Sequence, residues 1–487
     1  MIMTTTLSAV VFVEFGAPSS LANGAREIVA IDSASVLLDA SFHHGLLDFK
    51  NVTSVASTTT NGITVSLNVT FLPDGFTKLL TSNAAWTDVE GRQKFISLHS
   101  LITDFAEVPQ NFCSDVLTGD WSHPQEHTFT LISGDLLPSG FSPLHPISTL
   151  TVSNSTLVGG ISTTSTKSDP SLFVFDISST TEPIYLGSVD NASSTVRGVN
   201  DIAVSGNDMF VANAGQPSFA TCKEGPSCSQ LQIFDISNPS APLNIRNLEL
   251  STTSAPFATG SGGQSIGKSI AYANGYVYLG LTKTGSTAGE EFNVIDIRIP
   301  QAPLWIGGFS VGRSINRIIV RGTFAYLATD DPTQEFIILD IHDPTNIKLV
   351  GAYDAPGAST FGYGNALAIE GSFAALGRTY TPNRPDLSLL SIASAAPQLV
   401  SSEQIASRLD SVNIQGLLVR DFLLFVLTSN SLESFDLHDT AHPSLYTTPF
   451  LLPTGNTGTS LTCRGNTLYV GSVGPDQTGY LTVITGS

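Results

Sequence analysis

The chain has 487 residues, of which 13% are charged, and its 41 acidic and 21 basic side chains give a net charge of −20. This length is sufficient for a large core and two domains. Nucleic-acid binding and attachment to anionic membrane surfaces are both disfavoured, because each needs clustered Lys and Arg. No apolar run reaches the roughly 20 residues that a membrane-spanning helix requires.

Residues 1–106 combine one helical pattern with alternating strand patterns. Apolar residues recur close to helical spacing from Leu21 to Leu38. Apolar and polar residues alternate from Ile63 to Phe71, which predicts a half-buried strand. The segment 84–98 has two strand-like runs around a polar turn and predicts a hairpin. A long helix followed by antiparallel strands indicates a small α+β domain.

Several short segments in this region share a pattern with one known group of proteins. They are Gly62-Ile63-Thr64-Val65, Ala85-Trp86-Thr87, Glu90-Gly91-Arg92, Ile96-Ser97-Leu98 and Leu101-Ile102-Thr103-Asp104-Phe105. Over about residues 20–106 the chain resembles the C-terminal part of type IV pilin-like, or pseudopilin-like, proteins. The resemblance implies assembly with pilin-like subunits, or self-association, through this domain. The start departs from the family pattern, since a short apolar run, Leu7–Val13, leads into Glu14 and Gly16-Ala17-Pro18.

From residue 150 onward, a two-part pattern recurs seven times. Each copy begins with two apolar runs around a small turn, at 150–160, 202–212, 270–280, 318–328, 367–377, 417–427 and 461–471. A short apolar strand follows, starting at 172, 231, 292, 336, 387, 432 and 481, so successive copies are 44–61 residues apart. This spacing is typical of β-propeller blades. Turns such as Gly206-Asn207 and Asn274-Gly275 supply the positive φ of tight hairpins.

Each copy then continues through a Pro- and Asx-rich turn into a fourth strand, as at Pro183–Gly187, but the seventh copy stops before one. Residues 120–132 have the missing turn-then-strand pattern. We therefore expect a mainly β fold: a seven-bladed propeller over 120–487, closed by strand 120–132 and joined to the first domain by a linker at 107–119. A solenoid of stacked sheets is the alternative.

The segment Leu231-Gln232-Ile233-Phe234-Asp235-Ile236-Ser237-Asn238-Pro239-Ser240-Ala241-Pro242 resembles the LVIVD repeat of bacterial surface propellers. Residues 336–344 and 172–183 match this repeat nearly as well. The resemblance implies a seven-bladed propeller at the cell surface and no catalytic residues, because these repeats are scaffold.

Aspartates recur at the end of the third strand of the copies, and we assign them a structural role in the turn that follows; they are Asp176, Asp235, Asp296, Asp340 and Asp436. No residue is assigned to catalysis, to a cofactor or to a metal. Asp330, Asp331 and Glu335 are interpreted as a solvated loop, with calcium bound by their oxygens as the alternative.

Two cysteines lie six residues apart, Cys222 and Cys228, around Gly225-Pro226. A disulfide closing this loop is the interpretation we adopt over free thiols. Cys113 and Cys463 form a candidate second pair across the closing strand, and a buried free thiol at Cys463 is the alternative.

Four cations precede or enter first strands: Arg197, Lys268, Arg313 and Arg317. Packing or surface placement is the interpretation adopted, and a central channel that attracts an acidic ligand is the alternative.

The expected function is that of a non-enzymatic, pilus- or filament-associated protein at the cell surface. Its propeller would serve as a recognition, adhesion or structural module for an unknown extracellular ligand. The alternative is a propeller hydrolase or lyase with its active site in the channel.

Overall fold

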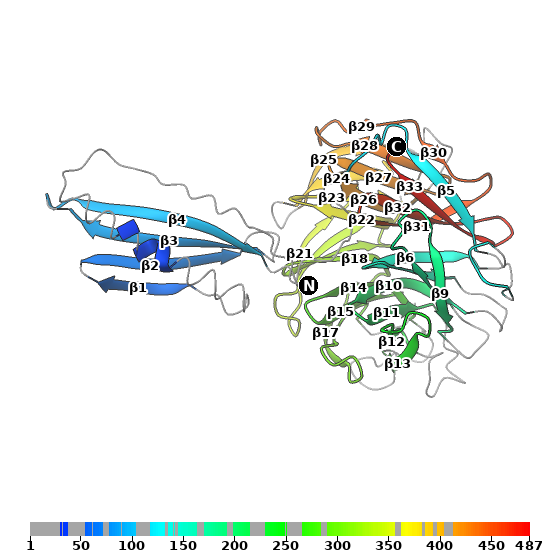
Figure 1. The fold of residues 1–487 in the computed structure, drawn as a ribbon, viewed down its shortest axis with the longest axis horizontal. Helices are drawn as coiled ribbons and strands as arrows, with labels where there is room; N and C mark the ends of the chain where they lie inside the picture. Colours follow the sequence, from blue (N-terminus) through cyan, green and yellow to red (C-terminus); the bar gives the residue numbers. More distant parts are fainter. Residues whose placement is uncertain are drawn as a thin grey trace. The chain divides into compact units, whose positions relative to one another are not determined.

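The computed structural model describes residues 30–31, 33–37, 54–60, 62–71, 77–88, 90–103, 117–131, 135–139, 141, 145–162, 170–191, 198–214, 229–248, 250, 265–283, 290–355, 362–381, 385–392, 397–403 and 413–487. The chain divides into two compact units, Met1–Pro109 and Gln110–Ser487. Figure 1 shows the strands of both units.

The first unit contains a four-stranded antiparallel sheet in the order β1 (Val55–Thr60), β2 (Ile63–Phe71), β3 (Thr77–Thr87) and β4 (Gln93–Thr103). One face of the sheet is apolar and buried, as the alternation along β2 predicts. Leu67 and Leu80 lie in this core together with Ala30 and Ala34 from the helical segment. At the β3–β4 turn, the Asp88 carboxylate accepts the backbone N–H groups of Glu90 and Arg92.

The expectation of a long helix plus sheet is met only for the sheet. Helical backbone within the described part of this unit is confined to residues 30–31 and 33–37, which is about two turns. Residues 21–29 of the predicted helix lie outside the described residues. Ala30 and Ala34 are four residues apart, so they share one helix face and allow a close approach to the sheet. The strands therefore carry most of this core, and a pilin-like domain with a long helix is not supported.

The second unit is built from repeated antiparallel sheets, six of which use consecutive strands. The first three contain β6 (Ile147–Ser153), β7 (Thr156–Ile161), β8 (Leu172–Asp176) and β9 (Ile184–Val189); β10 (Val199–Ser205), β11 (Asp208–Asn213), β12 (Leu231–Asp235) and β13 (Leu243–Leu248); and β14 (Gly267–Ala273), β15 (Tyr276–Leu281), β16 (Phe292–Asp296) and β17 (Leu304–Phe309). The next three contain β18 (Ile315–Arg321), β19 (Phe324–Thr329), β20 (Phe336–Asp340) and β21 (Lys348–Tyr353); β22 (Gly364–Glu370), β23 (Phe373–Arg378), β24 (Leu387–Ser391) and β25 (Gln398–Glu403); and β26 (Ile414–Arg420), β27 (Leu423–Thr428), β28 (Ser431–Asp436), β29 (Ser444–Leu445) and β30 (Phe450–Leu451).

The hairpins and buried strands follow from the repeated sequence pattern. Gly206 and Asn274 begin the β10–β11 and β14–β15 turns with φ of 59° and 55°. Glycine and asparagine adopt this left-handed conformation at low cost. The third strand of each of the first five sheets is buried over its first four residues, which explains why these runs are almost entirely apolar.

One further sheet joins two distant parts of the chain. It contains β31 (Thr457–Arg464), β32 (Thr467–Val473), β33 (Gly479–Thr485) and β5 (Gln125–Thr130). β33 pairs with β5 from Tyr480↔Thr130 to Thr485↔Gln125. Beside this pairing, Asp120 and Ser487 exchange backbone hydrogen bonds of 2.8 and 3.2 Å.

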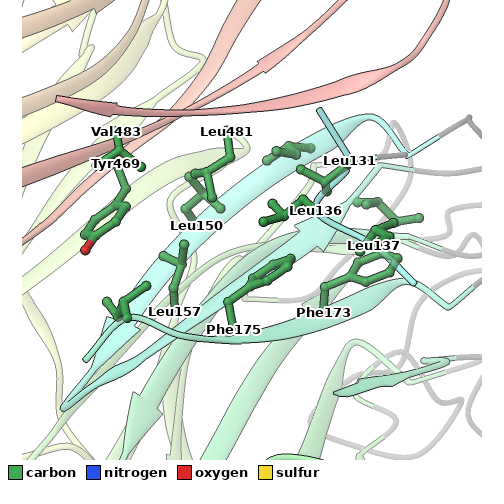
Figure 2. Close-up of a cluster of buried hydrophobic side chains, with 13 residues drawn as sticks. Leu131, Leu136, Leu137, Leu150, Leu157, Phe173, Phe175, Tyr469, Leu481 and Val483 are labelled. Atoms are coloured by element: carbon green, nitrogen blue, oxygen red, sulfur yellow. The ribbon is translucent and has the colours of Figure 1, made fainter. Parts of the chain in front are cut away.

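The first strands of the sheets pack on one another in the order β6, β10, β14, β18, β22, β26 and β31, and β31 packs on β6. They occupy the interior of the unit, while fourth strands such as β13, β17 and β21 lie at its periphery (Figure 1). Figure 2 shows Tyr469, Leu481 and Val483 of the last sheet meeting Leu150 and Phe175 of the sheet β6–β9 in one buried cluster. These features fit a β-propeller-like repeat protein.

Candidate functional site

The seven first strands surround a cavity of about 180 Å³, here termed the inner-strand cavity. Its lining is mostly polar and comes from β6, β10, β14, β18, β22, β26 and β31. The lining residues are Ser148, Thr149, Asn200, Asp201, Lys268, Asn316, Arg317, Asn365, Ala366, Leu367, Gln415, Gly416, Leu417, Thr459, Ser460 and Leu461.

A β-bulge occurs near the start of every first strand, where the pairing with the second strand skips one residue. A bulge turns the skipped side chain away from the regular alternation. The skipped residues all line the cavity: Ser148, Asn200, Lys268, Asn316, Asn365, Gln415 and Thr459. The bulges therefore give the cavity one side chain of this kind from each sheet.

Several of these side chains bind each sheet to the next. The side-chain amide of Asn200 donates to the Gly267 carbonyl at 2.6 Å. Asn316 and Asn365 donate to equivalent carbonyls one sheet further on, at 2.6 and 2.7 Å, and the Ser148 hydroxyl donates to the Val199 carbonyl. These bonds satisfy backbone carbonyls that the bulge leaves outside the ladder.

Lys268 is the charged member of this set. The inter-sheet hydrogen bond in its sheet is made instead by the neighbouring Ser269, whose hydroxyl donates to the Ile315 carbonyl at 2.8 Å. Burial lowers the pKa of the Lys268 ammonium, and the Asp330 carboxylate partly opposes this shift. The side chain of Lys268 lines the cavity, which is the position that the alternative interpretation expected, and attraction of an acidic ligand stays a prediction.

Arg317 also lines the cavity and is paired with Asp201. Its Nη1 lies 3.2 and 3.3 Å from the two Asp201 carboxylate oxygens. Asp201 is 5% exposed and also accepts the Thr149 hydroxyl and the backbone N–H groups of Ile202 and Ile270, at 3.0–3.2 Å. Its charge is therefore stabilised by several donors. Of the other predicted cations, Arg313 pairs with Asp331, and Arg197 lies outside the described residues.

The recurring aspartates all make the same turn contact. A side-chain oxygen of each one accepts the backbone N–H two residues further on, at 2.8–3.0 Å; they are Asp176, Asp235, Asp296, Asp340 and Asp436. This contact stabilises the turn that leads to the fourth strand.

The calcium alternative receives no support from the loop around residue 331. Asp330 accepts the Ser314 N–H at 2.7 Å, whereas Asp331 contacts Thr333 and Arg313. Glu335 is fully buried and pairs with Arg378 at 2.7 Å, so it does not belong to a solvated loop. Among the residues placed by the structure, no three His, Cys, Asp or Glu side chains are grouped to hold a metal ion.

Cys463 lies in β31, is 3% exposed and is disulfide-bonded. The other three cysteines lie outside the described residues. The pairings Cys222–Cys228 and Cys113–Cys463 therefore stay predictions.

A second recurring contact was not predicted from the sequence. A polar side chain immediately before the third strand accepts the backbone N–H of a residue that lies two or three positions beyond the end of the fourth strand. Gln230 accepts from Leu250, Glu291 from Gly312 and Glu335 from Ala355, at 2.6–3.0 Å. Aligning the copies on their third strands reveals this position, because three consecutive copies carry Gln or Glu there. The bulged residues show a similar signal, two positions before each first apolar run.

The LVIVD repeat family matches residues 228–248 and 312–355. These stretches include β12 with β13 and β18 to β21, so the resemblance to this repeat is confirmed in the second and fourth copies. A search of curated proteins found no match. Neither comparison supports the pilin-like resemblance of residues 20–106. No helix within the described ranges is long and apolar enough to cross a membrane.

Proposed function

We propose that residues 117–487 form a closed seven-bladed β-propeller, and that this propeller is a non-enzymatic recognition module displayed outside the cell. The pairing of β5 with β33 is the observation that supports a closed ring, and the disulfide-bonded Cys463 supports a place outside the cell. A sheet assembled from both ends of the unit closes the seam and leaves no open sheet edge there. The result is a rigid scaffold suited to presenting loops.

The distribution of polar contacts supports a scaffold. The repeated aspartates stabilise turns, and the asparagines around the cavity connect neighbouring sheets. On such a scaffold, recognition is expected from the connections. Those between Asn213 and Leu231 and between Leu248 and Gly267 exceed ordinary lengths, and we assign partner contact to them. The N-terminal unit would then supply attachment or self-association, and a Cys222–Cys228 disulfide would fit an oxidising compartment.

Two measurements on the full chain test this proposal. Trypsin added to intact native cells should remove the protein, while a cytoplasmic marker survives. The labelled chain should also bind saturably to some members of an array of glycans and extracellular proteins. Deletion of residues 251–264, or a separate deletion of residues 215–228, should weaken that binding without lowering the melting temperature. A chain found only in the cytoplasm, with every thiol reduced, would refute the proposed placement. Undiminished binding after deletion of residues 251–264, and after a separate deletion of 215–228, would refute the assignment to these loops.

A further inference from the structure

The inner-strand cavity has one sheet that differs from the others. At the bulged position, six sheets contribute Ser, Asn, Gln or Thr, whereas the sheet β14–β17 contributes Lys268. In this sheet, the hydrogen bond to the next sheet is made by Ser269, which is fully buried and donates its hydroxyl to the Ile315 carbonyl. Lys268 is therefore not needed to connect its sheet to the next. A lysine at this position also costs more free energy to desolvate than the neutral side chains at the same position of the other six sheets.

The charges on the cavity wall do not cancel. Lys268 and Arg317 are positive and Asp201 is negative, which leaves one net positive charge among the lining residues. Asp201 is already engaged by Arg317 and by two backbone N–H groups. The Asp330 carboxylate, outside the cavity lining, interacts electrostatically with the Lys268 ammonium, but within the described residues this ammonium has no ion pair or hydrogen bond. This cation lies in a chain whose net charge is −20.

We propose that the inner-strand cavity binds a small oxyanion, a carboxylate or phosphate group, through Lys268 and Arg317, which line the same cavity. Arg317 touches Asp201 only through Nη1, and its side chain is 45% exposed. The rest of its guanidinium therefore remains available in the cavity that Lys268 also lines, and both groups can form charge-assisted hydrogen bonds with oxyanions.

The cavity size limits what can enter. The inner-strand cavity has a volume of about 180 Å³. It is smaller than the roughly 300–1,000 Å³ of sites for drug-sized ligands. The bound group is therefore either a free small anion or the anionic group of a larger molecule, such as a sugar acid. This site is separate from the proposed partner contacts, so either proposal can fail without the other.

Calorimetric titration of the full chain with inorganic phosphate, acetate and glucuronate tests the site, with glucose as the neutral control. Lys268→Gln should weaken oxyanion binding by about 10- to 150-fold, the range expected for one lost charged hydrogen bond. Lys268→Arg should retain most of the affinity. Lys348→Gln is the matched control, because it removes the same charge from an exposed position on the fourth strand β21.

The three ligands also distinguish the source of the anion. Binding of phosphate or acetate indicates a free anion, and binding of glucuronate alone indicates a sugar-borne carboxylate. The proposal is overturned if none of the three binds, if Lys268→Gln binds as tightly as the parent, or if Lys348→Gln weakens binding equally. Should Lys268→Gln not fold, a saturable rise in the melting temperature with acetate or glucuronate supports the site, provided that it exceeds the rise with chloride at equal ionic strength and occurs in both the parent and Lys348→Gln. Its absence refutes the site.

Discussion

The ion pair between Glu335 and Arg378 is the contact whose loss we expect to be most damaging. Both side chains are fully buried, and Arg378 Nη2 donates to Glu335 Oε1 at 2.7 Å. Glu335 precedes β20 and Arg378 ends β23, so the pair joins adjacent sheets. Glu335→Gln removes the charge opposite a buried guanidinium while keeping the side-chain shape. Breaking a buried pair in this way costs about 3–5 kcal/mol.

The corresponding change in melting temperature follows from the size of the cooperative unit. Residues 117–487 number 487 − 117 + 1 = 371. At about 2.1 cal/mol/K per residue, the unfolding entropy is about 780 cal/mol/K, so the melting temperature should fall by about 4–6 °C. Differential scanning calorimetry at constant pH and salt measures this shift.

Two further variants make the measurement specific to the buried pair. Arg313→Gln breaks the more exposed Arg313–Asp331 pair and should lower the melting temperature by about 1 °C or less. The double variant Glu335→Gln/Arg378→Met removes both charges and should recover part of the loss. A Glu335→Gln protein that melts within about 1 °C of the parent would refute the reasoning.

Three other outcomes are expected. Deleting residues 107–135 removes β5 and exposes the edge of β33, so the melting temperature should fall and size-exclusion chromatography should show self-association. A monomer that melts like the parent would contradict the role of β5. Gly267→Ala should yield little soluble protein, because its Cβ would meet the backbone of Gln230 and Asn213, whereas Gly206→Asn, in an open turn at φ 59°, should match the parent in yield. Hydrogen bonds from Ser122 and His123 lower the pKa of Asp120 to about 2, so the stability that this ionised carboxylate contributes is complete above pH 3.8 and is lost as the pH falls toward about 2. An NMR titration of Asp120 should show that midpoint, and a midpoint that Ser122→Ala leaves unchanged would contradict the assigned cause.

The strands of the repeats were predictable because their pattern is local. The strand Leu231–Asp235 carries apolar side chains at Leu231, Ile233 and Phe234 and ends in an aspartate before a proline-containing turn, so it is recognisable without its neighbours. The N-terminal strands were recognisable for a similar reason, since alternation along Ile63–Phe71 reports one buried and one exposed face. Of the helix predicted over Leu21–Leu38, the structure describes residues 30–31 and 33–37 as helical, and the other positions lie outside the described residues.

The cavity was harder to predict because its residues come together only through the tertiary fold. Asn200 and Asn316 are 116 positions apart, and each is placed by a bulge that interrupts the alternation used to recognise strands. The Glu335–Arg378 pair links residues 43 positions apart, with no local pattern that connects them. Lys268 and Arg317 were considered as channel residues, but the sequence did not distinguish them from Arg313, which pairs with Asp331 at a more exposed position.

The pairing of β5 with β33 also fixes an order of events during synthesis. Thr130 pairs with Tyr480, so β5 waits for 480 − 130 = 350 further residues before its partner strand exists. At about 5–20 residues per second, this wait lasts roughly 20–70 s. Throughout that time the nascent chain presents an incomplete last sheet, and factors that bind exposed strands during translation or export would act on β5. Ribosome stalling between the codons of β32 and β33 would produce a chain whose last sheet lacks β33, the strand that pairs with β5.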